Sequence, residues 1–149
     1  MDNPGRILGL DIGHKRTGVA LSDETQLLAT PYSQFDTTNR KAWLESIQGV
    51  IQEYEVTKVV VGLPLNHHGE AGRDAETIGR YISALRSAVS VPVVEWDERF
   101  TTCQAERSLL EADVSRAKRK QVIDKVAAAI ILQSYLDSLR FSLDSDEYA

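Results

Sequence analysis

The order of the strand-like and helix-like segments constrains the fold of this 149-residue chain most strongly. Three strand-like segments come first, and after them helical and strand-like periodicities alternate. We expect the third strand to end at Pro31 or just after it. This order predicts an α/β fold, in which a five-stranded mixed sheet carries helices on both faces. The strands are expected at residues 6–12, 17–21, 27–32, 57–63 and 91–96, and the helices at 39–54, 75–88, 101–112 and 121–139.

Length and composition narrow the classes of protein further. The chain fits one domain over residues 1–140, followed by an acidic, frayed tail at 141–149. Its single cysteine, Cys103, excludes an internal disulfide and a multi-cysteine zinc site. The longest apolar run, 126–132, is far below the ~20 residues of a membrane span, and no secretory signal is recognisable. We therefore expect a soluble cytoplasmic protein that does not bind membranes.

One carboxylate interrupts the first strand. Asp11 alternates with Ile7 and Gly9 on one face of that strand, and a buried carboxylate without a partner costs several kcal/mol. Gly9 leaves room for another group to approach the backbone. The simpler interpretation is that Asp11 caps the turn at Gly13.

Further acidic residues follow a later strand and lie in the last helix. Asp97 and Glu98 come after the strand at 91–96, at the sheet edge where open α/β sheets bind ligands. Asp124 shares a helical stripe with Ala127, Ala128, Ile131 and Tyr135. The simpler interpretation of Asp97 and Glu98 is an ordinary polar loop. For Asp124, it is an aspartate in the first turn of a helix, where the helix dipole favours a negative charge.

Together these carboxylates indicate a metal site. The first strand should be central, with 57–63 and 91–96 parallel to it, so Asp11 and Glu98 would share an edge. The last helix can pack across the first strand and bring in Asp124. Three carboxylates need cations to neutralise them, and without His or Cys ligands they favour Mg²⁺ or Mn²⁺. Two such ions can cleave a phosphodiester.

Four motifs, in order and in register, resemble the YqgF/RuvX family of pre-16S rRNA nucleases, which are related to Holliday-junction resolvases. The resemblance covers nearly the whole chain. The motifs are Gly9-Leu10-Asp11-Ile12-Gly13 with Lys15-Arg16 and Gly18-Val19-Ala20; Val60-Val61-Gly62-Leu63-Pro64-Leu65-Asn66; Asp97-Glu98-Arg99 with Thr101-Thr102; and Lys118-Arg119-Lys120 with Asp124 and Ala127-Ala128.

The resemblance implies a single ribonuclease H-like nuclease domain that trims the 5′ end of the 16S rRNA precursor during ribosome biogenesis. It places the catalytic residues and metal ligands at Asp11, Glu98 and Asp124, with Asp97 and Arg99 in support. Asp97 adjoins Glu98, and either could reach the metal; we favour Glu98, with Asp97 orienting it.

Basic residues supply the expected nucleic-acid contacts. The formal net charge is -5, from 17 basic and 22 acidic residues, so phosphates must meet a local basic patch. The partners we expect are precursor rRNA and ribosomal particles, with the chain a monomer or weak dimer. The alternative interpretation of the basic residues is that they form a solvated face of the protein without a binding role. The candidates for binding nucleic acid are Lys15, Arg16, Arg116, Lys118, Arg119 and Lys120.

Three other functions compete with the nuclease. Asp11, Gly13 and Gly18 also resemble the phosphate loop of actin-like ATPases and sugar kinases, but 149 residues leave no room for the second lobe that those enzymes need. A resolvase of four-way DNA junctions would be expected to act as a dimer. A non-catalytic nucleic-acid-binding ribosome-assembly or transcription factor would gain nothing from clustered carboxylates.

Overall fold

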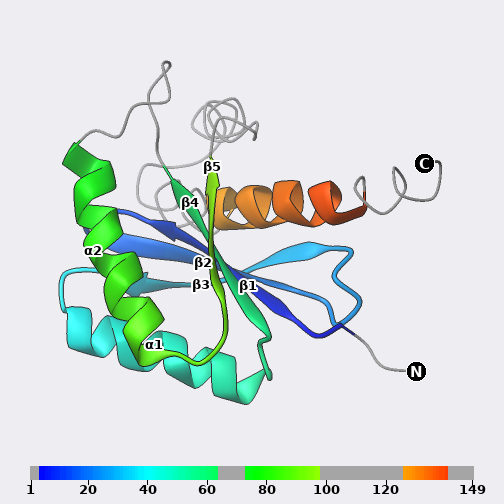
Figure 1. Ribbon diagram of the computed structural model, residues 1–149, viewed down its shortest axis with the longest axis horizontal. Coiled ribbons are helices and arrows are strands. Elements are labelled where there is room, and N and C mark those ends of the chain that lie inside the picture. Colours follow the sequence, from blue (N-terminus) through cyan, green and yellow to red (C-terminus); the bar gives the residue numbers. More distant parts are fainter. Residues whose placement is uncertain (1–3, 64–72, 98–125, 141–149) are drawn as a thin grey trace, which may run out of the picture.

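Five strands form one mixed sheet in the order β3-β2-β1-β4-β5 (Figure 1). This computed structural model describes residues 4–63, 73–97 and 126–140. The chain first makes an antiparallel meander, and the two later strands run parallel to β1, which is therefore central. The predicted mixed sheet is confirmed. Its strands are β1 (Ile7–Ile12), β2 (Arg16–Ser22), β3 (Ala29–Asp36), β4 (Lys58–Leu63) and β5 (Val93–Asp97).

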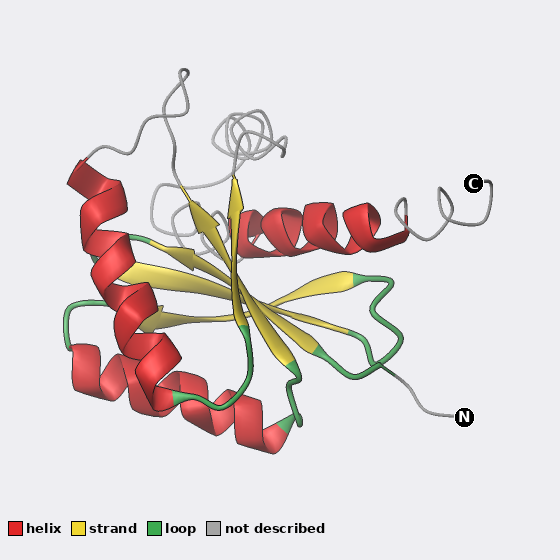
Figure 2. Cartoon of the chain, in the orientation of Figure 1, coloured by secondary structure: helices red, strands yellow, loops and turns green. Residues whose placement is uncertain are grey.

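Helices cover both faces of the sheet, as predicted (Figure 2). On one face lie α1 (Arg40–Glu53) and α2 (Arg73–Ala88), and on the other lies a helix over residues 126–140. The helix expected at 101–112, the start of the one expected at 121–139 and the tail at 141–149 lie outside the described residues. Within the described ranges, no helix is both long and apolar enough to span a bilayer.

Each face of the sheet has its own hydrophobic core. Strand alternation divides β1 between them: Leu8, Leu10 and Ile12 pack against α1 and α2, whereas Ile7 packs against the helix at 126–140. The stripe predicted for the last helix is buried, because the exposed fractions are 0% for Ala127, Ala128 and Ile131 and 7% for Tyr135. The core on this face fixes the helix across the middle of the sheet.

The third strand differs from its prediction. It runs from Ala29 to Asp36 instead of 27–32, while Leu28 is 66% exposed in the preceding loop. Pro31 does not end the strand, because β3 is an edge strand and proline needs no ladder hydrogen bond on the open side. The register shifts here, with Ser33 opposite Val19 and Pro31 opposite Ala20. This bulge lets the strand continue past the proline.

The fifth strand is also displaced from its predicted bounds of 91–96. It begins at Val93, because Pro92 has no amide hydrogen to donate, although the Pro92 carbonyl accepts from the Val59 N–H at 2.9 Å. It ends at Asp97, which was expected to follow the strand rather than belong to it. Asp97 therefore has a defined place in the sheet, paired with Leu63.

Candidate catalytic edge of the sheet

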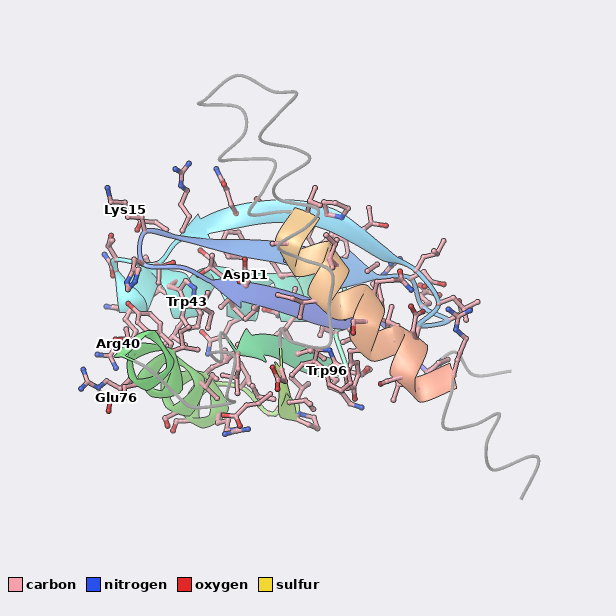
Figure 3. All side chains as sticks on the ribbon, turned by 90° about the horizontal axis from the view of Figure 1, so that it is seen from above. Asp11, Lys15, Arg40, Trp43, Glu76 and Trp96 are labelled. Atoms are coloured by element: carbon pink, nitrogen blue, oxygen red, sulfur yellow. The ribbon has the colours of Figure 1, made fainter. Side chains whose placement is uncertain are left out.

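Asp11 is the only charged residue of β1 and is half-buried. It lies one residue before the carboxyl end of the strand, opposite Gly18 of β2. Alternation puts its side chain on the face shared by Ile7 and Gly9, where the helix at 126–140 packs. Figure 3 shows Asp11 on the central strand, beside the end of that helix that begins at residue 126. A carboxylate thus stands at the margin of an otherwise apolar face.

Gly9 marks the point where the last helix crosses β1. A Cβ atom on Gly9 would lie 2.8 Å from the Leu132 Cβ and 3.2 Å from the carbonyl oxygen of Ala128. Both distances are shorter than ordinary van der Waals contacts, so only glycine permits this approach. The expectation that Gly9 leaves room for another group beside Asp11 is therefore confirmed.

The direction of the last helix follows from its contacts. Ala128 and Leu132 lie against Gly9, whereas the Tyr135 hydroxyl accepts from the Lys58 Nζ at 2.9 Å. Lys58 begins β4 and pairs with Ile7 at the amino end of β1. The helix therefore runs antiparallel to β1, and its residue-126 end is directed toward the edge that carries Asp11.

Replacing Gly9 by alanine should destabilise the protein by about 1–3 kcal/mol, because the added methyl group overpacks the helix crossing. Gly49 provides the matched control: it lies within α1, and a Cβ there would meet nothing within 4 Å. Gly49→Ala should stabilise by about 0.5–1 kcal/mol through the lower entropy of the unfolded chain. Urea denaturation measures both changes, and equal effects of the two substitutions would contradict this account of the crossing.

Asp97 ends β5 at the same edge but on the other face of the sheet. Its partner Leu63 packs into the core under α1 and α2, and Val93, four residues earlier in the same strand, belongs to that core. Glu95 lies between Val93 and Asp97 in β5, and its Oε1 is 3.8 Å from the Nη1 of Arg86 in α2. Trp96, by contrast, packs against the last helix. Strand alternation therefore directs Asp97 away from the face of Asp11.

Lys15 and Arg16 lie in and after the turn that joins β1 to β2. The Gly13 N–H donates to the Arg16 carbonyl at 2.9 Å, which closes the turn. Lys15 is exposed and Arg16 is half-buried at the start of β2. Because β1 ends at Ile12, this basic turn stands directly beside the Asp11 edge.

A buried hydroxyl network supports this turn, and sequence reasoning missed it. The Trp43 Nε1 donates to the Thr17 Oγ1 at 2.8 Å, and the Thr17 and Thr37 hydroxyls are 2.8 Å apart. Thr37 in turn donates its N–H to the Lys15 carbonyl at 2.9 Å. The available signal was Thr17, a polar residue in an apolar strand. Trp43 is 1% exposed, so this network lies within the core.

The other predicted site residues lie outside the described residues. Among the residues that the structure describes, no three His, Cys, Asp or Glu side chains form a group that could hold a metal ion. Asp11 is the only predicted ligand within the described ranges. These ranges also contain Asp97, which was predicted to support the site. Outside them are Glu98, Arg99, Arg116, Lys118, Arg119, Lys120 and Asp124.

Solved structures identify the class of fold. *Thermus thermophilus* RuvC in complex with a Holliday junction substrate matches with a TM-score of 0.59 at 15% identity, over 90% of this chain and 96% of that one. The yeast mitochondrial Holliday junction resolvase Ydc2 matches with a TM-score of 0.54 at 10% identity, over 91% and 79%. The central β1, its meander and the flanking helices thus form the ribonuclease H-like fold of the resolvases.

Sequence comparison gives the family. The family model described as "RuvX: Holliday junction resolvase" matches residues 5–138, so the chain belongs to the RuvX family. A relative from *Thermoanaerobacter pseudethanolicus* is 48% identical over 134 residues, which cover 89% of this chain and 96% of the relative. One from *Geobacillus kaustophilus* is 51% identical over 137 residues, covering 91% and 99%. Both bear the name "Putative pre-16S rRNA nuclease". The family resemblance drawn from the four motifs is confirmed.

Proposed function

We propose that this chain is a metal-dependent nuclease that processes the 5′ end of the 16S rRNA precursor during ribosome biogenesis. The observation that carries the proposal is Asp11, a half-buried carboxylate at the carboxyl end of the central strand, two residues from the glycine where a helix crosses. The relatives named for pre-16S rRNA support the choice of substrate, because their identity of about 50% extends over nearly their whole length.

The proposed metal ligands are Asp11, Glu98 and Asp124. The donor chemistry fits Mg²⁺ or Mn²⁺, because all three residues offer carboxylate oxygens and Asp11 is half-buried one residue before the carboxyl end of the central strand. When bound there, the metal supplies an activated water and stabilises charge on the leaving oxygen of the phosphodiester.

Strand alternation supports Glu98 over Asp97 as the ligand. Asp97 is directed to the α2 face, on which Leu63 and Val93 lie, so the next residue along the chain is the better match for the face of Asp11. Asp97 then serves as an orienting residue, and Arg99 neutralises charge near the scissile phosphate.

Helical spacing and helix direction support Asp124. It precedes Ala128 by four residues, and residues at this spacing share one face of a helix. The carbonyl of Ala128 lies against Gly9, and the residue-126 end of the helix is directed toward the Asp11 edge. A carboxylate two residues before Val126 suits a site at this edge.

The basic residues bind and orient the RNA. Lys15 and Arg16 stand beside the Asp11 edge, where they contact phosphates flanking the scissile bond. A second set of contacts comes from the basic segment that precedes the last helix. Without such contacts, a protein of net charge -5 would repel a polyanion. The members of that segment are Arg116, Lys118, Arg119 and Lys120.

Resolution of four-way DNA junctions is the second candidate. It is favoured by the description of the family model and by the fold shared with RuvC bound to a Holliday junction. A test that presents both substrates to the same protein separates the two functions.

That test incubates the purified chain with ribosomal particles that contain precursor rRNA, and in parallel with a four-way DNA junction. Each reaction contains Mg²⁺, Mn²⁺ or a chelator. We expect shortening of the precursor 5′ end in either metal, no shortening in chelator, and no symmetric cleavage of the junction. Cleavage of the junction alone would favour the resolvase, and full activity in chelator would refute the metal site.

A further inference from the structure

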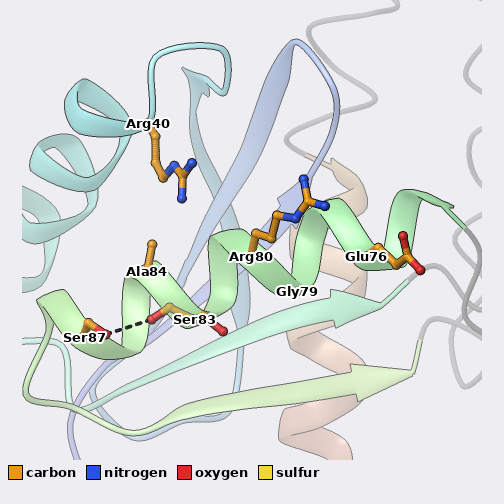
Figure 4. A pocket seen from close by; sticks show the side chains of 7 residues that line it. All are labelled: Arg40, Glu76, Gly79, Arg80, Ser83, Ala84 and Ser87. Atoms are coloured by element: carbon orange, nitrogen blue, oxygen red, sulfur yellow. Dashed lines mark hydrogen bonds between the residues drawn. The ribbon is translucent and has the colours of Figure 1, made fainter.

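A polar groove opens between the first turn of α1 and the outer side of α2 (Figure 4). Its volume is about 740 Å³, and charged and hydroxyl side chains line most of it. Sites for small organic ligands are mostly apolar and enclosed, so this groove suits a polar chain better than a small molecule. The lining residues relevant here are Arg40 from α1 and Glu76, Gly79, Arg80, Ser83 and Ser87 from α2.

Two arginines line this groove, Arg40 from α1 and Arg80 from α2 (Figure 4). The Arg40 guanidinium lies 5.6 Å from the centre of the Tyr81 ring, a cation–π distance. Tyr81 is itself fixed, because its hydroxyl donates to the Thr37 carbonyl at 2.6 Å and its ring meets Trp43 edge-on at 4.9 Å. Arg40 is thus held in place at the mouth of the groove.

The first turn of α1 has an unfavourable charge pattern. Its first two residues are Arg40 and Lys41, and no acidic residue lies in that turn. The positive end of the helix dipole disfavours cations there. Asn39 caps the helix by accepting from the Ala42 N–H at 3.2 Å, so the turn forms despite the repulsion. A bound anion would relieve that repulsion.

The groove lies at the same end of the molecule as the β1–β2 turn (Figure 3). Thr37, three residues before Arg40, donates its N–H to the Lys15 carbonyl at 2.9 Å. Figure 3 shows Lys15 and Arg40 at the same end of the molecule, with Asp11 further along the central strand. Lys15 of the β1–β2 turn and Arg40 of the groove are therefore joined through the short segment that precedes α1.

We propose that this groove binds the phosphodiester backbone of the RNA strand beyond the cleavage site, with Arg40 and Arg80 each contacting a phosphate. The inference rests on the proposed function for the identity of the polyanion. Glu76, one helical turn before Arg80, also lines the groove, and its negative charge limits the number of phosphates accepted. The serine hydroxyls supply neutral hydrogen bonds to backbone oxygens. The groove thus extends the substrate footprint well past the scissile bond.

The test compares Arg40→Gln and Arg80→Gln with a matched control, Arg140→Gln. Arg140 is exposed at the end of the last helix and pairs with Asp137, so the control removes the same charge elsewhere. Binding of two single-stranded RNAs is titrated over a range of salt concentration: a short one centred on the cleavage site and one that extends well beyond it. For the long RNA, each groove variant should weaken affinity about tenfold and lower the slope of log K against log salt by about 0.7–0.9. The short RNA and the control should show neither change.

Wild-type affinity and slope for the long RNA in both groove variants would overturn the inference. The proposed function would then still stand if the same preparations shorten precursor rRNA in Mg²⁺. Conversely, the groove assignment is supported, and the proposed function is not, if the binding effects appear but the wild-type chain cleaves no precursor. A polyglutamate peptide serves as a competing ligand, and a loss of binding confined to that peptide would assign the groove to an acidic protein segment instead.

Discussion

Replacing Asp11 by asparagine should slow cleavage of precursor rRNA by about a thousandfold. The substitution keeps the shape of the side chain but removes one carboxylate from the proposed metal site. A misplaced catalytic ion loses transition-state stabilisation of about 4 kcal/mol, which corresponds to that factor. Binding of RNA should hardly change, because the phosphate contacts come from basic residues. Single-turnover cleavage at saturating protein measures the effect.

The melting temperature supplies a second readout for the same variant. Without metal, Asp11→Asn should be as stable as the wild type or more so, because it removes one of the anions that repel one another in the proposed metal site. The stabilisation that Mg²⁺ or Mn²⁺ gives the wild type should disappear. Asp137→Asn is the matched control: that carboxylate is 54% exposed on the last helix and should affect neither quantity. An active Asp11→Asn protein would contradict the catalytic role of Asp11.

Asp124→Asn should lower the cleavage rate by a similar factor while leaving the metal-free protein equally or more stable. Cleavage slows because the substitution keeps the shape of the side chain but removes a metal ligand. Stability without metal does not fall, because the lost carboxylate is an anion that repels the neighbouring carboxylates. Thermal melting in chelator and one cleavage assay measure the two effects.

The simpler role for Asp124 makes the opposite prediction. An aspartate that only favours the start of a helix would cost up to ~1 kcal/mol of stability when replaced and would leave cleavage intact. A destabilised but active Asp124→Asn protein would therefore remove this residue from the catalytic site.

Local patterns predicted most of the fold because each segment carried its own periodicity. The alternation in β1 placed Ile7 and Gly9 on one face, against which the structure packs the last helix, and the helical stripe through Ala128 anticipated the buried face of that helix. The errors arose where pairing between strands decided the boundaries. Pro31 predicts the end of a strand. However, β3 lies at the edge of the sheet and has a bulge opposite Val19 and Ala20, and both features allow the strand to continue past the proline.

The candidate site was predictable only where a single residue conflicted with its surroundings. Asp11 in an apolar strand and the neighbouring Gly9 were such signals, and the structure places both beside the last helix. That Asp97 faces α2 emerged only from its register with Leu63. The approach of Arg40 to α2 depends on helices far apart in sequence, so no local pattern could reveal that groove.

The most direct test of the central claim replaces a single oxygen of the RNA. A precursor is prepared with sulfur in place of one non-bridging oxygen of the scissile phosphate, and its cleavage by the wild-type chain is measured in Mg²⁺ and in Mn²⁺. Sulfur is a softer ligand, which Mn²⁺ accepts better than Mg²⁺. If a metal held at the Asp11 edge contacts that phosphate, cleavage should fall sharply in Mg²⁺ and recover in Mn²⁺. An equal effect of sulfur in the two metals would contradict a metal-dependent centre at this site.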